Sequence, residues 1–433
     1  MTIPALTLVR QNRQQPTIIE VAKETRRQWL ESKVAQRIKS GDKIAVGCGS
    51  RGIANIAVIV RSTVEALQEL GAKPFIVAAM GSHGGATAEG QRELLASYHI
   101  SEAELGIPVK TEMDSQQIGI NSWGEPVWWD RNALAADGVV TVSRIKPHTD
   151  YRGNYESGIT KMCVIGLGKR EGASQHHRWG WKGLQQMIPE TMKTILEKTQ
   201  FLGGLGILEN AREETAHLQV VDRDDILAVE PGLLERAREM MGRIPFAELD
   251  VLIVGEIGKN YSGAGIDPNV VGRLLIEAAP ELETCKPRIT RMCALDLSPE
   301  SHGNGTGVGI ADLTTERLLA SIDPVPFRMN NLTACFLWRS KLPLAFRTDR
   351  ECILTAIETC WQPISEKLKF AIIPNTLEVM EMWISAPLLA EAKANPEIEI
   401  VTEPRSVPFD ENGNMKQEEL FPHSVRAKRV GGH

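Results

Sequence analysis

Residues 43–80 constrain the fold most, because they follow the order strand, glycine loop, helix, strand. Apolar residues at 43–47 predict a buried strand that leads into the loop GCGSRG at 47–52. A helix is expected from Ile53 to about Leu70, and a second buried strand over 74–80. Two parallel strands need a crossover of this kind, most often a helix. We therefore expect an α/β fold with mainly parallel sheets flanked by helices.

The same alternation continues along the chain, with short apolar runs as strands and longer periodic segments as helices. A short hairpin is expected around Trp123 and Gly124. The other expected strands are 139–142, 162–168, one within 244–258, 291–297, 332–338 and 369–374, and the other expected helices are 21–40, 86–99, 181–199, 314–322 and one within 351–367.

A chain of 433 residues is too long for one ordinary core, so two domains are expected. The composition changes near Gly242, where an apolar run leads into the glycine-rich turn GKNYSGAGIDPNVVGR. We place an N-terminal α/β domain, binding cofactor and substrate, at 1–245 and a C-terminal α/β domain at 246–433, with the active-site cleft between them. Residues 403–433 are rich in proline and charge, and we expect them to wrap a surface rather than add core.

The net charge of −6 provides no basic field for nucleic acid or an anionic membrane, so a small molecule is the expected partner. The seven cysteines are an odd number without C-x-x-C spacing, which is typical of reduced thiols in a cytoplasm. The chain starts without a basic segment followed by an apolar one, and no apolar run reaches membrane-spanning length. The expected location is the cytoplasm, with no membrane partner.

The loop at 47–52 fits G-x-G-x-x-G between a strand and a helix, which is the pattern of a dinucleotide-binding turn. Such a site also uses an acidic residue at the end of the next strand, and here that strand ends in AMGSH. A tight turn that needs small residues is the favoured interpretation, and an NAD-linked oxidoreductase stays open as an alternative. In either case Arg51 lies beside a helix N-terminus, a suitable place for a carboxylate or phosphate.

Two histidines follow predicted strands, His83 in GSHGGATAEGQ and His148 in RIKPHTDYRG. The carboxyl ends of parallel strands share one sheet edge, so both imidazoles lie at the same edge if the strands are neighbours. Two imidazoles can act as general acid and base on opposite faces of one carbon. His176 and His177 add possible metal ligands, but the spacings of zinc hydrolases are absent.

Lys161 follows Ser157 by four residues in ESGITKM, next to an apolar run. A lysine at such a position is usually solvated or ion-paired. If it is buried beside cationic groups, it becomes a nucleophile for a carbonyl or thiocarbonyl group. Composition alone favours the solvated or ion-paired lysine.

A set of motifs runs through most of the chain, over about 44–315. They are GSRGI, FIVAAMGSHGGATAEGQ, RIKPHTDYRG, ESGITKM, IGLGK, GKNYSGAGIDPNVVGR and SHGNGTGVGIADLTTER. Together they resemble the nickel-dependent lactate racemase family, in the branch whose members act on other 2-hydroxy acids. No single motif is specific, but their combination is.

The resemblance implies that Lys161 carries the nickel-pincer nucleotide, a pyridinium ring whose thioacid groups hold Ni(II), through a thioamide. His177 would supply the protein's nitrogen to nickel, and His176 is one residue off the family spacing and ranks second. His83 and His148 would be the acid/base pair. The remaining implied contacts are Ser50, Gly158 and Lys259 to the cofactor, and Arg51 and Arg152 to the substrate.

The resemblance also implies an isomerase, which racemises or epimerises a 2-hydroxy acid by proton-coupled hydride transfer. Lactate-specific members have an acid-x-Thr-Arg pattern where this chain has CGSR at 48–51, and a shorter segment between His148 and Ser157. The changed pocket indicates a substrate other than lactate. Separate proteins would make the cofactor. A homo-oligomer stays open, and so does a non-catalytic nucleotide- or metal-binding protein.

Overall fold

The computed structural model describes residues 2–49, 52–277 and 285–431, which form two compact units. One unit is residues 15–241, and the other combines residues 1–14 with 242–433. We predicted a first domain at 1–245, so the structure moves the division to residue 241 and transfers the N-terminal segment to the other unit. The reason is strand β1 (Leu6–Gln11), which pairs with β15 (Glu381–Ser385) and β16 (Ile398–Ile400).

The unit at 15–241 is built on a six-stranded sheet in the order β4-β3-β2-β7-β8-β9. Neighbouring strands are parallel, except that β9 is antiparallel to β8. The strands are β2 (Lys43–Cys48), β3 (Lys73–Ala78), β4 (Val109–Lys110), β7 (Gly138–Arg144), β8 (Phe201–Glu209) and β9 (Thr215–Asp222). Because β2, β3 and β7 are buried on both faces, helices must cover both faces of the sheet.

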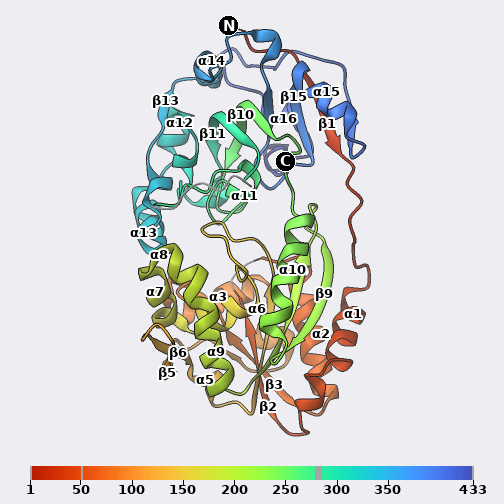
Figure 1. The fold of residues 1–433 in the computed structure, drawn as a ribbon, viewed down its shortest axis with the longest axis vertical. Coiled ribbons are helices and arrows are strands. Elements are labelled where there is room, and N and C mark those ends of the chain that lie inside the picture. Colours follow the sequence, from red (N-terminus) through yellow and green to blue (C-terminus); the bar gives the residue numbers. More distant parts are fainter. Residues whose placement is uncertain (1, 50–51, 278–284, 432–433) are drawn as a thin grey trace. The chain divides into compact units, whose positions relative to one another are not determined.

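Helices α1 (Val21–Leu30) and α2 (Ile56–Glu69) pack on this sheet through an apolar cluster that includes Trp29 and Leu67 (Figure 1). The indole Nε1 of Trp29 donates to Thr63 Oγ1 at 2.9 Å, which satisfies a buried donor. The other helices of this unit are η1 (Ala35–Arg37), η2 (Gly84–Ala86), α3 (Ala88–Ser97), α4 (Glu102–Leu105), α5 (Arg131–Leu134), α6 (Ile159–Lys161), η3 (Met162–Gly166), α7 (Lys169–Arg178), α8 (Gly180–Lys182), η4 (Gly183–Met187), α9 (Ile188–Lys198) and α10 (Ile226–Met240).

The segment at 162–168 is helical, so our prediction of a strand there was wrong. Its first five residues form the π-helical turn η3 between α6 and α7. An apolar run of this length is buried in either conformation, so its composition does not separate a strand from a helix. A Cβ on Gly166 would lie 2.6 Å from the carbonyl oxygen of Ala79, so this glycine allows the turn to pack directly on the end of β3.

The predicted hairpin near Trp123 is present as the antiparallel pair β5 (Ser115–Ile120) and β6 (Pro126–Asp130). The helix predicted over 21–40 is shorter, because α1 ends at Leu30 and only the short turn η1 follows. Strands β8 and β9 and helix α10 were not predicted. The α/β class with a mainly parallel sheet is confirmed.

The second unit contains an eight-stranded sheet in the order β13-β12-β11-β10-β14-β15-β1-β16. Strands β10 to β14 are parallel to one another, whereas β15, β1 and β16 pair antiparallel. The remaining strands of this unit are β10 (Glu248–Ile257), β11 (Arg288–Leu297), β12 (Leu313–Thr315), β13 (Leu344–Phe346) and β14 (Phe370–Ile373). Its helices are α11 (Pro268–Val271), η5 (Pro299–Ser301), η6 (Val308–Ile310), α12 (Glu316–Ala320), α13 (Pro324–Ala334), η7 (Leu337–Ser340), α14 (Asp349–Thr359), η8 (Ser365–Lys367), α15 (Ala386–Ala394), α16 (Gln417–Leu420) and α17 (Val425–Gly431).

Two predictions for this unit differ from the structure. The predicted strand at 332–338 is the end of α13 and the turn η7. Helix α13 starts at Pro324, with Asp323 as its N-cap. An Asp-Pro pair is a helix start signal, whereas the strand prediction used only the apolar run. The tail at 403–433 does more than wrap a surface, because Leu420 and Phe421 are buried in the core of the unit.

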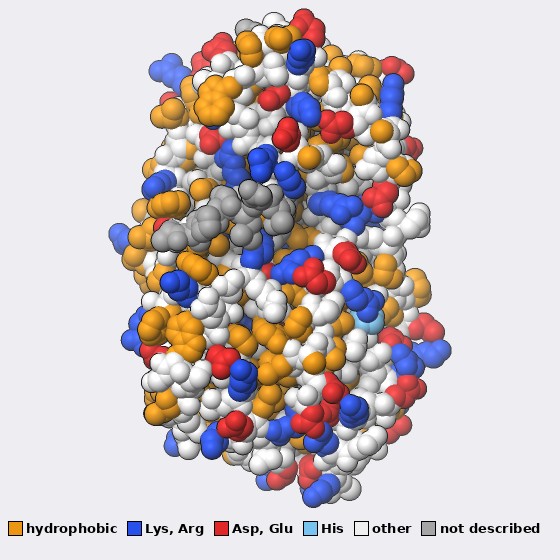
Figure 2. All heavy atoms as spheres, viewed as in Figure 1, with side chains coloured by type: hydrophobic (Ala, Val, Ile, Leu, Met, Phe, Trp, Pro, Cys, Tyr) orange, Lys and Arg blue, Asp and Glu red, His pale blue; other side chains and the backbone are white. Residues whose placement is uncertain are grey.

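None of the described helices is long and apolar enough to cross a membrane. Figure 2 shows Lys and Arg side chains intermixed with Asp and Glu on the visible face.

Candidate active site

The carboxyl edge of the sheet in the unit at 15–241 carries the loops of the two predicted acid/base residues, His83 and His148. Strand β2 lies between β3 and β7, and Cys48 is paired with Ala78 on one side and Val142 on the other. The loop with His83 follows β3 and the loop with His148 follows β7. These strands are therefore two steps apart, roughly 10 Å, with the glycine loop between them. Ser50 and Arg51, predicted to contact cofactor and substrate, lie outside the described residues.

The side chain of His83 is exposed, and its loop is hydrogen-bonded to the fully buried side chain of Gln91 in α3. Its Nε2 donates to the carbonyl oxygens of Gly81 and His83, both at 3.1 Å. A Cβ on Gly90 would lie 2.1 Å from the carbonyl oxygen of Gly84, so the glycines of this motif serve close backbone packing. Sequence analysis missed Gln91, although it lies four residues before buried Leu95, on the buried face of the helix.

The loop that carries His148 is organised around Glu156, whose side chain is wholly buried. One carboxylate oxygen accepts from the backbone N–H of His148 at 2.5 Å, and the other accepts from Gly153 N at 2.9 Å and Arg238 Nη2 at 2.5 Å. Charge-assisted bonds of this kind are stronger than neutral ones. Glu156 therefore fixes the backbone that presents His148, and its partner on α10 is too distant in sequence to have suggested this.

Arg152 lies in the same loop and stabilises it through hydrogen bonds to the backbone. Its Nη1 donates to the carbonyl oxygens of His148 at 2.6 Å and Tyr151 at 3.0 Å. The substrate contact that we predicted for Arg152 stays a prediction, and its Nη1 is already bonded within the protein.

Lys161 ends helix α6, and its Nζ contacts Nε2 of His148. The same nitrogen lies 5.8 Å from the ring centroid of Tyr151. Two residues that the sequence placed in separate motifs therefore meet, and both side chains are part-buried.

The start of α6 is set by Glu230, a buried residue of α10 that sequence analysis missed. Its Oε2 accepts from the N–H of Thr160 at 3.0 Å and from the hydroxyl of Thr160 at 2.5 Å. Burial raises the pKa of Glu230 to about 7, although the bonds from Thr160 act in the opposite direction. A Cβ on Gly158 would lie 1.9 Å from Glu230 Oε1, so Gly158 allows this carboxyl to approach. The cofactor contact that we predicted for Gly158 stays a prediction.

His176 and His177 differ in what their nitrogens already bind. Both nitrogens of His176 are bonded, Nδ1 to the Gly172 carbonyl oxygen at 2.8 Å and Nε2 to Thr191 Oγ1 at 3.1 Å, and burial lowers its pKa to about 4. His177 donates from Nδ1 to the carbonyl oxygen of Ala173 at 2.7 Å, which leaves the lone pair on Nε2.

The pKa of His177 is lowered from its usual value by its surroundings. Burial lowers this pKa, the bond to Ala173 opposes the shift, and an electrostatic interaction with Lys161 lowers it further. His177 and Lys161 therefore lie in one electrostatic environment.

The residues directly before helix α2 do not favour a dinucleotide. Helix α2 starts only at Ile56, and just before it the N–H of Ala54 donates to Glu209 Oε1 at 2.7 Å. The other oxygen of Glu209 accepts from Arg144 at 2.7 Å. A carboxylate thus already occupies a position where a bound phosphate would need free N–H groups.

Residues 15–185 match the family model described as the lactate racemase N-terminal domain. This match supports a lactate racemase-family protein. The family suggested by the sequence motifs is confirmed. No curated protein is detectably similar to this chain.

Two solved structures are similar to this chain at low sequence identity. The structure of the lactate racemase apoprotein from Thermoanaerobacterium thermosaccharolyticum is similar with a TM-score of 0.53 and 12% identity, over 87% of this chain and 99% of that chain. A protein from Thermotoga maritima is similar with a TM-score of 0.41 and 15% identity, over 56% of this chain and 64% of that one. The first similarity shows a common α/β fold.

The lactate racemase N-terminal domain does not contain Lys259, which lies in the unit with residues 242–433. There its Nζ donates to the carbonyl oxygen of Gly263, and its backbone N–H donates to Ser301 Oγ at 2.9 Å. The predicted cofactor contact of Lys259 stays untested.

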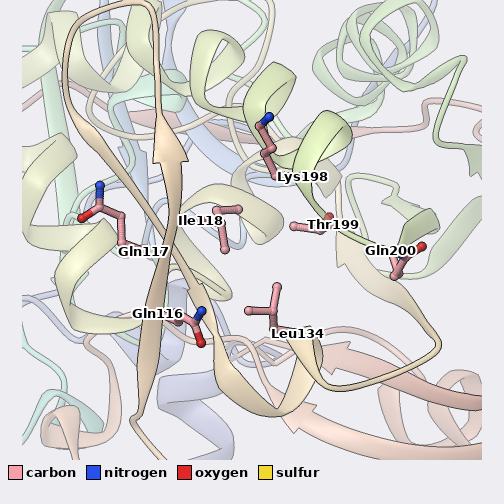
Figure 3. A pocket seen from close by; sticks show the side chains of 7 residues that line it. All are labelled: Gln116, Gln117, Ile118, Leu134, Lys198, Thr199 and Gln200. Atoms are coloured by element: carbon pink, nitrogen blue, oxygen red, sulfur yellow. The ribbon is translucent and has the colours of Figure 1, made fainter.

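The metal donors of the lactate racemase domain are few. Over the described ranges of the chain, His, Cys, Asp and Glu side chains form no group of three or more that could hold a metal ion. A pocket of about 420 Å³ is present elsewhere in this unit, and Figure 3 shows the side chains that line it. It is lined by Gln116, Gln117, Ile118, Leu134, Lys198, Thr199 and Gln200.

Proposed function

We propose that this protein is an isomerase that racemises or epimerises a 2-hydroxy acid other than lactate, with a nickel-pincer nucleotide attached to Lys161. Its lactate racemase N-terminal domain supports the racemase class. The attachment of the cofactor to Lys161 is supported by one observation. Nζ of Lys161 contacts Nε2 of His148, and Lys161 also interacts electrostatically with His177.

The residues of this edge fit the cofactor that the family implies. Lys161 offers an amine for the covalent bond. His177 offers Nε2 while Nδ1–H is bonded to a backbone carbonyl, the arrangement that orients most metal-binding histidines. His176 has both nitrogens engaged, so we propose His177 as the nickel ligand. Within the described ranges no three His, Cys, Asp or Glu side chains form a metal-binding group, so the other donors would belong to the cofactor itself.

The chemistry supplied by the bound cofactor is acceptance and return of the hydride at C2 of the substrate. The protein's task is the proton of the 2-hydroxyl. His83 and His148 stand on loops on either side of β2, so each can serve the enantiomer whose hydroxyl points toward it. Arg51 is proposed to hold the carboxylate while the planar 2-keto acid turns.

The loops of His83 and His148 are fixed by different side chains, which supports separate positions for two bases. Gln91 fixes the backbone of the His83 loop, and Glu156 fixes that of the His148 loop. Preorganised bases of this kind need no rearrangement before the proton transfers. The segment between His148 and Ser157, longer than in the lactate-specific members, supports a substrate other than lactate.

Intact-mass spectrometry of the full chain, expressed with and without cofactor-synthesis proteins, tests the proposal. We expect a mass adduct that maps to Lys161, about one nickel per chain, and interconversion of enantiomers in a chiral chromatography screen of 2-hydroxy acids. Lys161→Ala should lose adduct, nickel and turnover together, whereas Lys39→Ala, at an exposed position, should keep all three. Adduct-free protein from the co-expressing host would contradict the proposal.

A further inference from the structure

Helix α7, which carries His177, is bordered by the hairpin β5–β6. At the start of the helix, the buried Nζ of Lys169 pairs with Asp130, the last residue of β6, at 2.8 Å. Directly after the end of the helix, Trp179 Nε1 donates to Glu125 Oε1 at 2.9 Å, in the turn between β5 and β6. The hairpin therefore contacts both ends of the helix.

Buried hydrogen bonds also join the hairpin to the side of α7. Asn121, the first residue of the turn, donates from Nδ2 to Thr191 Oγ1 of α9 at 2.9 Å. The same hydroxyl oxygen lies 3.1 Å from Nε2 of His176. All three side chains are buried, so these bonds are shielded from water.

The direction of each bond follows from backbone groups at the two ends of this chain of bonds. Oδ1 of Asn121 accepts from two backbone N–H groups of the turn, at 2.9 and 3.1 Å, so the other terminal atom is the amide nitrogen. Burial disfavours the charged form of His176, and Nδ1 of the neutral ring lies 2.8 Å from the carbonyl oxygen of Gly172. A carbonyl oxygen only accepts, so Nδ1 donates and Nε2 accepts. The Thr191 hydroxyl therefore accepts from Asn121 and donates to His176.

We infer that the hairpin β5–β6, through Asn121, Thr191 and His176, fixes the rotation of α7 about its own axis and thereby directs Nε2 of His177 toward the metal. Successive side chains of an α-helix point about 100° apart. With His176 bonded to α9, His177 faces another side, where it interacts electrostatically with Lys161. The inference rests on the proposed function for the group that His177 binds, and on the hydrogen bonds alone for its orientation.

A small rotation of α7 is enough to misplace the imidazole of His177. The end of the side chain lies roughly 6 Å from the helix axis, so a rotation of about 10° moves it by on the order of 1 Å. Binding groups must be held to within about 0.5 Å. Loss of a residue that orients a metal ligand typically costs about 10- to 100-fold in metal affinity. Thr191 and His176 are therefore positioning residues, which act on the metal only through His177.

Crystal structures of the cofactor-free full chain, as wild type, Thr191→Val and Thr191→Ser, test the inference directly. Thr191→Val leaves Nε2 of His176 and Nδ2 of Asn121 buried without their partner, so His176 has to move, and α7 with it. We expect His177 to be displaced by on the order of 1 Å in Thr191→Val, and to stay in place in Thr191→Ser, which keeps the hydroxyl. An unmoved His177 in Thr191→Val would overturn the inference.

Nickel affinity gives an independent result in the protein from the co-expressing host. Competition with a chelator should show about 10- to 100-fold weaker nickel binding in Thr191→Val, and binding close to that of the wild type in Thr191→Ser. The visible absorption of bound nickel should also shift only in Thr191→Val. A purely structural threonine would change the unfolding midpoint alone, so wild-type nickel binding by folded Thr191→Val would contradict the inference.

Thr25→Val is the matched control, because Thr25 is another buried helical threonine, whose hydroxyl bonds within α1. It should leave His177 and nickel binding unchanged. If Thr191→Val does not fold, Asn121→Asp replaces it. The new carboxylate still accepts from the turn but cannot donate, so it draws the Thr191 hydroxyl away from His176 and should produce the same displacement.

The two experiments separate this inference from the proposed function. A wild type that binds no nickel would contradict the proposed function, and the crystal structures would still decide whether the hairpin orients His177. Nickel bound equally by the wild type and Thr191→Val, with His177 unmoved, would do the reverse.

Discussion

Glu230 makes the stability of the unit at 15–241 depend on pH, and Glu230→Gln should remove that dependence. The carboxyl is wholly buried, and its pKa rises from 4.5 to about 7 because burial disfavours the charged form. Between these values the folded protein keeps a proton that the unfolded chain has released. Stability therefore falls as pH rises from about 4.5 to 7, and the contribution is constant above that window.

The size of the effect follows from the pKa values. A rise from 4.5 to about 7 corresponds to roughly 3 kcal/mol between the two ends of the window. Glutamine retains an oxygen that can accept both bonds from Thr160, so the variant keeps the contacts at the start of α6 while losing the ionisation. We expect the free energy of unfolding of Glu230→Gln, relative to the wild type, to increase by roughly 3 kcal/mol from pH 4.5 to pH 8.

Guanidinium unfolding of the full chain at several pH values gives this difference. Subtracting the wild type removes the titration of all other groups. Glu197→Gln, at an exposed position, is the matched control for removing one negative charge from a helix. A Glu230→Gln difference that stays flat from pH 4.5 to 8 would refute the reasoning, because the buried carboxyl would then titrate alike in both states.

Three further predictions concern other buried contacts. Glu156→Ala should destabilise the fold by about 3 kcal/mol or more, since it leaves several donors unpaired, and hydrogen exchange at the His148 amide should become faster. Lys169→Met should cost about 3–5 kcal/mol in denaturant unfolding, because it removes the ion-pair partner of Asp130 where both side chains are 0% exposed. A loss below 1 kcal/mol in either variant would contradict the corresponding argument. His177→Ala should lower nickel from about one per chain to near zero by metal analysis while the lysine adduct remains, and retained nickel would assign the ligand elsewhere.

The sequence by itself predicted the crossover at 43–80, because its period and glycine boundaries agree with one local structure. It did not resolve 162–168 or 332–338. A short apolar run is compatible with a buried strand and with a buried helix, and only its neighbours decide between them. Strand β1 shows the same limit, since its partners β15 and β16 come from the far end of the chain.

Some residues of the candidate site could be predicted from local sequence, and others could not. Motifs in the sequence suggested His83, His148 and Lys161 as candidates, because reactive side chains at strand ends and glycine turns leave local patterns. Glu156 and Glu230 left none, since a buried carboxyl is recognised only by the donors that the fold brings to it.

The two adjacent histidines at 176 and 177 show what only the tertiary structure decided. They are the same residue type in the same helix, yet one has both nitrogens bonded and the other keeps Nε2 for a ligand. Local sequence determines which groups are present. The packing of distant segments determines which of their hydrogen-bonding atoms are still available, and that availability sets the chemistry.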